Sequence, residues 1–209
     1  METVEKIKLT EKQIGDVENG KIVAIKASWD EFLEFTLQCK YKTDYHNGEI
    51  IIMGAANPLH EVLVSDFIML FGNFYKSKGY LIAGSNLGIS IPEMDSYYNP
   101  DVTIIKDKLK FKKDSKFIFT NPFIIIEILS KSTAYYDFFE KRQKYQKLED
   151  LQEMVFVDRF LKTINVFKRT NDHKVWVETV YDSPNDLVVV DILTFELGGI
   201  FNNLPNIED

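Results

Sequence analysis

Two acidic residues stand in segments that otherwise have the composition of buried β-strands. Glu127 lies inside the apolar run FIIIEILS (123–130), and Asp101 immediately precedes the apolar run VTII (102–105). A buried carboxylate without a partner commonly costs several kcal/mol, so it has to be neutralised, paired or bound to a cation. Each acid taken alone is better explained as a strand cap or as the partner of a lysine than as part of a functional site. The pair of acids in apolar surroundings favours a shared site.

Adjacent strands could bring the two carboxylates to the same end of a sheet, where they would hold one divalent cation. The carbonyl oxygen of Ile128 is a candidate third ligand. Mg²⁺ and Mn²⁺ prefer such oxygen ligands. A metal bound in this way activates a water molecule and stabilises charge on a phosphate, which predicts phosphate chemistry.

The distribution of charge is compatible with a polyanionic substrate. The chain has 209 residues and a formal net charge of -7, which argues against a general nucleic-acid coat protein. Residues 101–147, however, contain 11 Lys and Arg against 6 Asp and Glu. This basic segment fits a polyanion that approaches one face, and a solvated lysine-rich loop explains it equally well.

The hydrophobic pattern predicts alternating helices and strands. Ser28 and Glu31 form a predicted capping box for a helix that ends near Leu37, and Asn47-Gly48 predicts a turn before a strand at 49–53. Apolar residues at three- and four-residue steps predict a helix over 59–76, and a second helix is expected over 132–148, capped by Ser132 or Thr133. Further strands are expected at 21–26, 80–86, 87–92, 101–107, 122–130, 153–158, 162–169, 174–181 and 186–192.

This order of elements is typical of an α/β or α+β domain with a mixed central sheet. Residues 1–27 are expected to form an N-terminal arm, and residues 28–209 a single domain. Cys39 is the one cysteine, and the charged N-terminus has no signal-peptide pattern, so we expect a cytoplasmic protein. The apolar runs are far shorter than the roughly 20 residues of a membrane helix.

The motif NPDV at Asp101, followed 26 residues later by IEILSKST around Glu127, resembles the PD-(D/E)xK nuclease superfamily. Within that superfamily, residues 29–204 are most similar to the Uma-two family of restriction-endonuclease-like proteins. The resemblance implies a restriction-endonuclease-like mixed central sheet flanked by helices, with a C-terminal β-hairpin extension. It also implies that Asp101 and Glu127 are the metal ligands and catalytic acids.

The resemblance also assigns the cation of the motif, with one departure. The usual lysine stands two residues after the glutamate, and this position is Leu129. The resemblance implies that Lys141, from the following helix, replaces it as a catalytic residue, with Lys144 as a weaker candidate. Asp137 lies one helical turn before Lys141 and could orient it.

Three further residues match the family pattern or lie beside it. Glu49 would be an additional catalytic carboxylate that could hold a second metal, or it is a surface acid that flanks the turn. His60 would bind substrate, or it caps its helix. Lys131, next to the end of the Glu127 strand, is a second candidate for substrate binding.

These observations predict a Mg²⁺-dependent (or Mn²⁺-dependent) endonuclease that hydrolyses DNA phosphodiester bonds. The alternative is a catalytically weak nucleic-acid-binding or regulatory domain that retains the nuclease fold, which the replacement of the usual lysine by Leu129 favours. The expected partner is DNA, RNA is also compatible, and no membrane is expected. A homodimer fits both functions, because cleavage of a duplex often needs two copies of a site.

Overall fold

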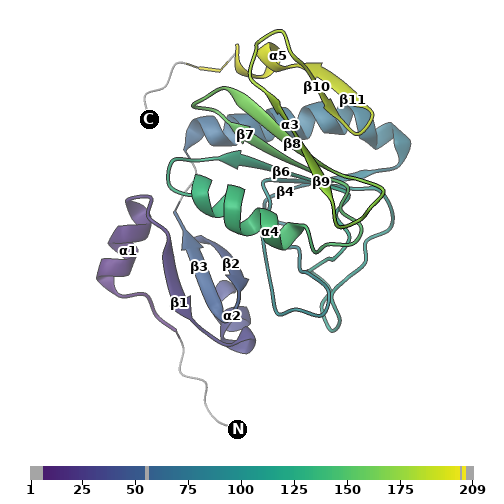
Figure 1. Cartoon of the computed structure of the whole chain (residues 1–209). Helices are drawn as coiled ribbons and strands as arrows, with labels where there is room; N and C mark the ends of the chain where they lie inside the picture. Colours follow the sequence, from purple (N-terminus) through teal and green to yellow (C-terminus); the bar gives the residue numbers. More distant parts are fainter. Residues whose placement is uncertain (1–6, 55–56, 203, 206–209) are drawn as a thin grey trace.

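A six-stranded mixed sheet forms the centre of the molecule (Figure 1). The computed structural model describes residues 7–54, 57–202 and 204–205. The strand pair β6·β7 is parallel and the other neighbouring pairs are antiparallel, which confirms the predicted mixed sheet. In spatial order the strands are β4 (Leu81–Gly84), β5 (Val102–Ile105), β6 (Ile124–Leu129), β7 (Glu153–Asp158), β8 (Thr163–Arg169) and β9 (Trp176–Tyr181).

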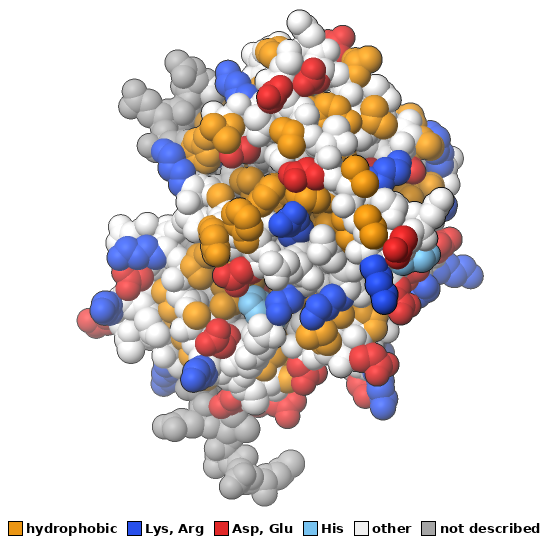
Figure 2. All heavy atoms as spheres, in the orientation of Figure 1, with side chains coloured by type: hydrophobic (Ala, Val, Ile, Leu, Met, Phe, Trp, Pro, Cys, Tyr) orange, Lys and Arg blue, Asp and Glu red, His pale blue; other side chains and the backbone are white. Residues whose placement is uncertain are grey.

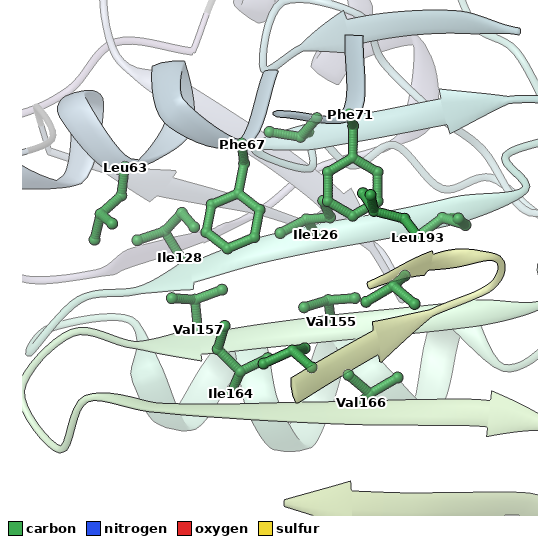
Figure 3. Close-up of a cluster of buried hydrophobic side chains, with 14 of the residues drawn as sticks. Leu63, Phe67, Phe71, Ile126, Ile128, Val155, Val157, Ile164, Val166 and Leu193 are labelled. Atoms are coloured by element: carbon green, nitrogen blue, oxygen red, sulfur yellow. The ribbon is translucent and has the colours of Figure 1, made fainter. Parts of the chain in front are cut away.

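Helices cover the two faces of this sheet. Helix α3 (Pro58–Tyr75), which continues into the short 3₁₀ turn η1 (Lys76–Lys78), lies behind the sheet in Figure 1. The π-helical segment η2 (Tyr136–Lys141) and helix α4 (Arg142–Tyr145) lie in front of it. Figure 3 shows the core on the α3 side, where aromatic and leucine side chains of α3 pack on alternate residues of β6, β7 and β8.

The alternation along β6 decides where Glu127 points. Ile124, Ile126 and Ile128 belong to the core under α3, whereas Ile125 and Leu129 pack on the η2–α4 side. Successive side chains of a strand point to opposite faces, so Glu127 shares the face of Ile125 and points toward η2 and α4. The apolar residues on both sides of Glu127 in β6 thus reflect burial of the strand on both faces.

A second, smaller sheet carries the N-terminal part of the domain. Its strands β1 (Val23–Lys26), β3 (Glu49–Met53) and β2 (Lys42–His46) are antiparallel, and helices α1 (Glu11–Glu18) and α2 (Trp29–Thr36) pack with them. The capping box between Ser28 and Glu31 is present. Asn47 and Gly48 have φ values of 54° and 78°, which is the backbone of a two-residue hairpin turn, so this predicted turn is confirmed.

The C-terminal region extends the main sheet and covers part of it. Strands β8 and β9 form the expected hairpin at one edge of the sheet. A further hairpin, β10 (Leu187–Val190) and β11 (Leu193–Glu196), is followed by helix α5 (Leu197–Phe201), and its Val188, Val190 and Leu193 join the core under α3. No helix in the described part of the chain is long and apolar enough to span a membrane.

Some expectations about the elements were wrong. Residues 87–92 do not form a strand, because Ile89 makes only isolated bridges to Tyr98 and Phe119, and the hydroxyl groups of Ser90 and Ser96 bond the backbone in place of a ladder. The helix after β6 is not capped by Ser132 or Thr133. Instead, the Ser130 hydroxyl accepts the N–H of Thr133. The elements α1, β2, β11 and α5 were not anticipated.

Candidate active site

Strand β2 presents three polar side chains to the main sheet. Lys42, Asp44 and His46 alternate with Thr43 and Tyr45, and Tyr45 packs in the opposite direction with the core of the N-terminal sheet. Because side chains two residues apart share a face, the three polar residues lie on one side of β2. Asp44 is completely buried and accepts the N–H of Asn99 (3.0 Å). This face of β2 supplies one side of the site.

The second side of the site consists of the two acids that the sequence singled out. The register of β5 and β6 pairs Val102 with Ile126, so the residue before Val102 lies opposite Glu127. The backbone N–H of Asp101 points to Oε2 of Glu127 (3.4 Å), and the N–H of Ile128 donates to Oδ2 of Asp101 (2.9 Å). The structure therefore brings the two carboxylates together at one end of the sheet.

Asp101 is surrounded by positive and donor groups. The ammonium of Lys42 donates to its Oδ1 (2.8 Å), and Nε2 of His60, in the first turn of α3, lies 3.0 Å from its Oδ2. Burial alone would raise the pKa of Asp101, but the charge of Lys42 and the hydrogen bond from His60 outweigh it and hold this pKa well below its usual range. Asp101 is therefore ionised.

Glu127 has a different environment, although it is the neighbour of Asp101. It accepts a hydrogen bond from the Tyr145 hydroxyl (2.6 Å) and one from Lys141 (3.3 Å), both to Oε1. Burial raises the pKa of Glu127 to about 8, because the attraction of Lys141 offsets the loss of solvation only in part and the charges of Asp101 and Asp137 add repulsion. Below this pH, Glu127 is protonated.

Lys141 is a buried counter-ion at the centre of the cluster. Its side chain is 1% exposed, and its nitrogen lies near Asp137 (2.8 Å), Asp44 (3.2 Å) and Glu127 (3.3 Å). Burial lowers the pKa of a lysine, but these carboxylates outweigh it and raise the pKa of Lys141 well above its usual value. Lys141 lies in the π-helical turn, a feature that is frequent at functional sites.

The cluster contains more buried acids than cations. Its carboxyl groups are those of Asp44, Asp101, Glu127 and Asp137, and its ammonium groups are those of Lys42 and Lys141. His60 adds a positive charge when it is protonated, and its pKa is raised because attraction to Asp101 outweighs its burial. The carboxyl groups of Asp101 and Glu127 offer hard oxygen ligands that suit a divalent cation, which would displace the proton of Glu127 on binding.

Only two acids of the cluster, Asp101 and Glu127, were predicted to hold the metal. Within the described residues, no group of three or more His, Cys, Asp or Glu side chains is arranged to ligate one ion. Mg²⁺ is commonly held by one or two carboxylates and keeps several waters, so a pair of acids is sufficient for this ion. The donor set therefore fits Mg²⁺ or Mn²⁺.

The remaining predicted residues are placed differently. Lys141 and His60 lie in the cluster, next to Glu127 and Asp101 respectively. Glu49 lies opposite His46 in the β2–β3 hairpin, on the same face as Asp44 but beside the cluster. Lys131 is exposed, and its ammonium lies 5.1 Å from the ring centroid of Phe160.

Sequence reasoning missed two members of the site, Lys42 and Asp44. The signal that could have found them is the alternation in KTDYH (42–46), which ends at a two-residue turn. Alternation of this kind predicts a strand, and Lys42, Asp44 and His46 would then share one face.

Within the basic segment 101–147, the lysine-rich residues 106–116 lie in the loop between β5 and β6, as the loop interpretation predicted. Lys110 pairs with Asp150 (2.8 Å), and the ammonium of Lys106 lies over the ring of Phe123. On the face shown in Figure 2, basic, acidic and apolar side chains are interspersed.

A mixed sheet with one parallel pair, covered by helices and carrying two acids on adjacent strands, defines a protein of the restriction-endonuclease-like class. The chain belongs to the Uma2 family, described as "Putative restriction endonuclease", whose model matches residues 29–199. This confirms the resemblance that the motifs around Asp101 and Glu127 indicated.

Comparisons with individual proteins agree with this assignment. The chain is 31% identical over 149 residues to the uncharacterized protein sll1609 of Synechocystis sp., covering 71% of this chain and 84% of that protein. It is 29% identical over 180 residues to slr1290 of the same organism, covering 86% and 93% respectively. A crystal structure from Anabaena variabilis, described as a putative nuclease belonging to DUF820, shares the fold with a TM-score of 0.68 and 20% identity, over 87% of this chain and 99% of that one.

Proposed function

We propose that this protein is a Mg²⁺- or Mn²⁺-dependent endonuclease that hydrolyses phosphodiester bonds of DNA. The observation that carries the proposal is the pairing of Asp101 and Glu127 at one end of two adjacent strands, within a buried cluster of four carboxyl groups and two lysine ammonium groups. Membership of a restriction endonuclease family supports the same reaction class.

In this proposal Asp101 and Glu127 hold the metal. When bound, the ion activates a water molecule and stabilises charge on the phosphate. The protein keeps both acids in place: His60 and the Ile128 N–H orient Asp101, while Tyr145 and Lys141 orient Glu127. Such support is what keeps a reacting group in its productive geometry.

Glu49 and Lys131 have secondary roles in the proposal. Glu49, beside His46, adds negative charge near the site and is a candidate ligand of a second ion. Lys131 lies at the end of the Glu127 strand and is exposed, so it is a candidate contact for the DNA backbone. Two copies of the chain would supply a site for each strand of a duplex.

A binding domain with weak catalysis is the second candidate. Leu129, at the position of the usual lysine, is buried in the core on the η2–α4 side and offers no charge. A nuclease fold without this cation would still bind metal and DNA while cleaving slowly.

A plasmid-nicking assay with Mg²⁺, Mn²⁺ or EDTA separates the two functions. The wild type is expected to convert supercoiled DNA to nicked and linear forms only with metal, and Asp101→Asn and Glu127→Gln are expected to lose about 10²–10³-fold or more of the rate. Asp107→Asn, an exposed acid of the β5–β6 loop, is the matched control and should retain activity. The same assay with RNA tests the choice of nucleic acid.

Calorimetric titration with Mn²⁺ completes the test. Metal binding that disappears in Asp101→Asn and Glu127→Gln, together with cleavage, supports the nuclease. Metal binding without cleavage by the wild type favours the binding domain. Absence of metal binding in the wild type would contradict the proposed site.

A further inference from the structure

Two lysines, Lys42 and Lys141, contact the paired acids, and they differ in whether their N–H donors are available to a substrate. The Lys141 ammonium has three N–H donors, and three carboxylates lie within 3.3 Å of it. Its side chain is 1% exposed. Lys141 is thus fully engaged inside the protein and has no donor left for a substrate.

Lys42 is arranged differently. Among the described residues, its ammonium contacts one carboxylate oxygen, Oδ1 of Asp101, at 2.8 Å. Its side chain is 28% exposed, whereas that of Asp101 is 4% exposed. Lys42 therefore lies between the buried acid and solvent, with N–H donors available to an incoming anion.

The position of Lys42 also suits the role of the lysine that the motif usually has two residues after its glutamate. The lysine of this motif would be on β6, where Leu129 is instead packed in the core. Lys42 approaches the same acids from β2, on the face that it shares with Asp44. A cation beside a metal-binding acid is positioned where charge develops on a phosphate during hydrolysis.

We infer that Lys42 is the catalytic cation of this site and that its ammonium contacts a non-bridging oxygen of the scissile phosphate, whereas Lys141 is a positioning residue for Glu127 and Asp44. This inference rests on the proposed phosphodiesterase function. In the reaction, the water oxygen bonds to phosphorus and the bond from phosphorus to the leaving oxygen breaks. One water proton ends on the leaving oxygen, the other is released from the phosphomonoester, and Lys42 keeps all its protons.

Single-turnover cleavage with Mn²⁺ tests the assignment. Lys42→Met is expected to lower the saturating single-turnover rate by about 10²–10³-fold, a larger change than in the concentration that gives half of this rate, and Lys42→Arg to recover part of the rate. Lys40→Met, an exposed lysine two residues away that pairs with Glu18, is the matched control and should cleave like the wild type. Lys141→Met is expected to lower the melting temperature, which Lys42→Arg should not do.

A measurement on the wild type separates this inference from the proposed function. Reductive methylation read by mass spectrometry should modify Lys42 in the free protein and spare it when a short DNA duplex is bound in Ca²⁺. Lys141 should stay unmodified in both states. If the wild type does not cleave DNA, the proposed function fails, while protection of Lys42 still supports its contact with phosphate.

Two results would overturn the inference. One is methylation of Lys42 at the same rate with and without bound DNA. The other is cleavage by folded Lys42→Met at a rate within about threefold of the wild type, which would leave the nuclease function standing and remove Lys42 from it.

Discussion

Asp101 and Glu127 are neighbours in space, yet their pKa values are displaced in opposite directions. Asp101 has Lys42 and His60 against its oxygens, so its ionised form is stabilised. Glu127 shares Lys141 with Asp44 and Asp137 and is also repelled by Asp101, so burial dominates and its protonated form is favoured. Pairs of titratable groups whose environments separate their pKa values are typical of catalytic sites.

The raised pKa of Glu127 predicts how stability depends on pH. The folded protein holds a proton on Glu127 up to about pH 8, whereas the unfolded chain releases it near the ordinary glutamate pKa of 4.5. Folded molecules therefore bind more protons than unfolded ones in this window, and the free energy of unfolding falls as pH rises through it. The glutamine in Glu127→Gln resembles the protonated acid, so this variant does not lose free energy of unfolding as the pH rises. We expect the variant to gain on the order of 2–4 kcal/mol relative to wild type between pH 5 and 8.

Urea unfolding at several pH values in EDTA measures this difference. Asp101→Asn is the matched control, because the pKa of Asp101 is lowered on folding. The ionised Asp101 therefore stabilises the protein at pH values above the pKa of the unfolded chain, and this stability is lost as the pH falls toward the pKa of the folded protein. That variant should be less stable than wild type at both pH 5 and pH 8. A constant difference between Glu127→Gln and wild type from pH 5 to 8 would show that Glu127 is ionised throughout.

Part of the site could be predicted at the level of residues. Asp101 and Glu127 could be identified because acids are unusual in apolar strand sequences. The four-residue spacing of Asp137 and Lys141 predicted an ion pair, and the structure shows this pair at 2.8 Å. The contact of Lys42 with Asp101 joins residues 59 apart in sequence, and no local pattern specifies such a pair. It depends on how the N-terminal sheet docks on the main sheet.

At the scale of elements, strong local signals were reliable and weak ones were not. The capping box before α2, the Asn-Gly turn before β3 and the apolar run of β6 each predicted the observed element. Helix α1 was missed although Thr10 and Gln13 form a capping box, because its eight residues include one buried apolar side chain, Val17. Its position depends on tertiary contact rather than on periodicity.

The close approach of α1 to Gly54 gives a prediction for the docking of this helix. A Cβ on Gly54, which follows β3, would collide with the carbonyl oxygen of Val17. Gly54→Ala is therefore expected to destabilise the protein by about 1–3 kcal/mol and to loosen α1. Hydrogen exchange should speed up in residues 11–18, while the amide of Ile128, which bonds Asp101 on the main sheet, should keep its protection.

Gly15→Ala is the control within the same helix. A Cβ at Gly15 meets nothing within 4 Å, so alanine should stabilise α1 by about 0.5–1 kcal/mol. Unchanged exchange of 11–18 in Gly54→Ala would mean that α1 tolerates a shift away from β3.

At the scale of the whole molecule, an acidic protein is proposed to act on an acidic polymer. The net charge of -7 opposes non-specific binding to DNA. Several surface lysines are also paired with acids: Lys21 with Asp16, Lys40 with Glu18, Lys110 with Asp150, and Lys168 with Glu153. Paired lysines contribute little to a field that would attract DNA, so binding should depend on a few contacts at the site.

This charge distribution predicts a weak dependence of DNA affinity on salt. Each neutralised phosphate contributes about -0.9 to the slope of log K against log salt, and two or three contacts give a slope of about -2 to -3. Between 50 and 200 mM salt, affinity in Ca²⁺ should thus fall by roughly 10–60-fold, rather than the 10³–10⁵-fold typical of 6–10 contacts. Fluorescence anisotropy with a labelled duplex measures the slope, and Lys42→Met should reduce it by about 1. A slope near -6 would instead reveal an extended basic surface, because the cluster around Asp101 and Glu127 cannot supply that many phosphate contacts.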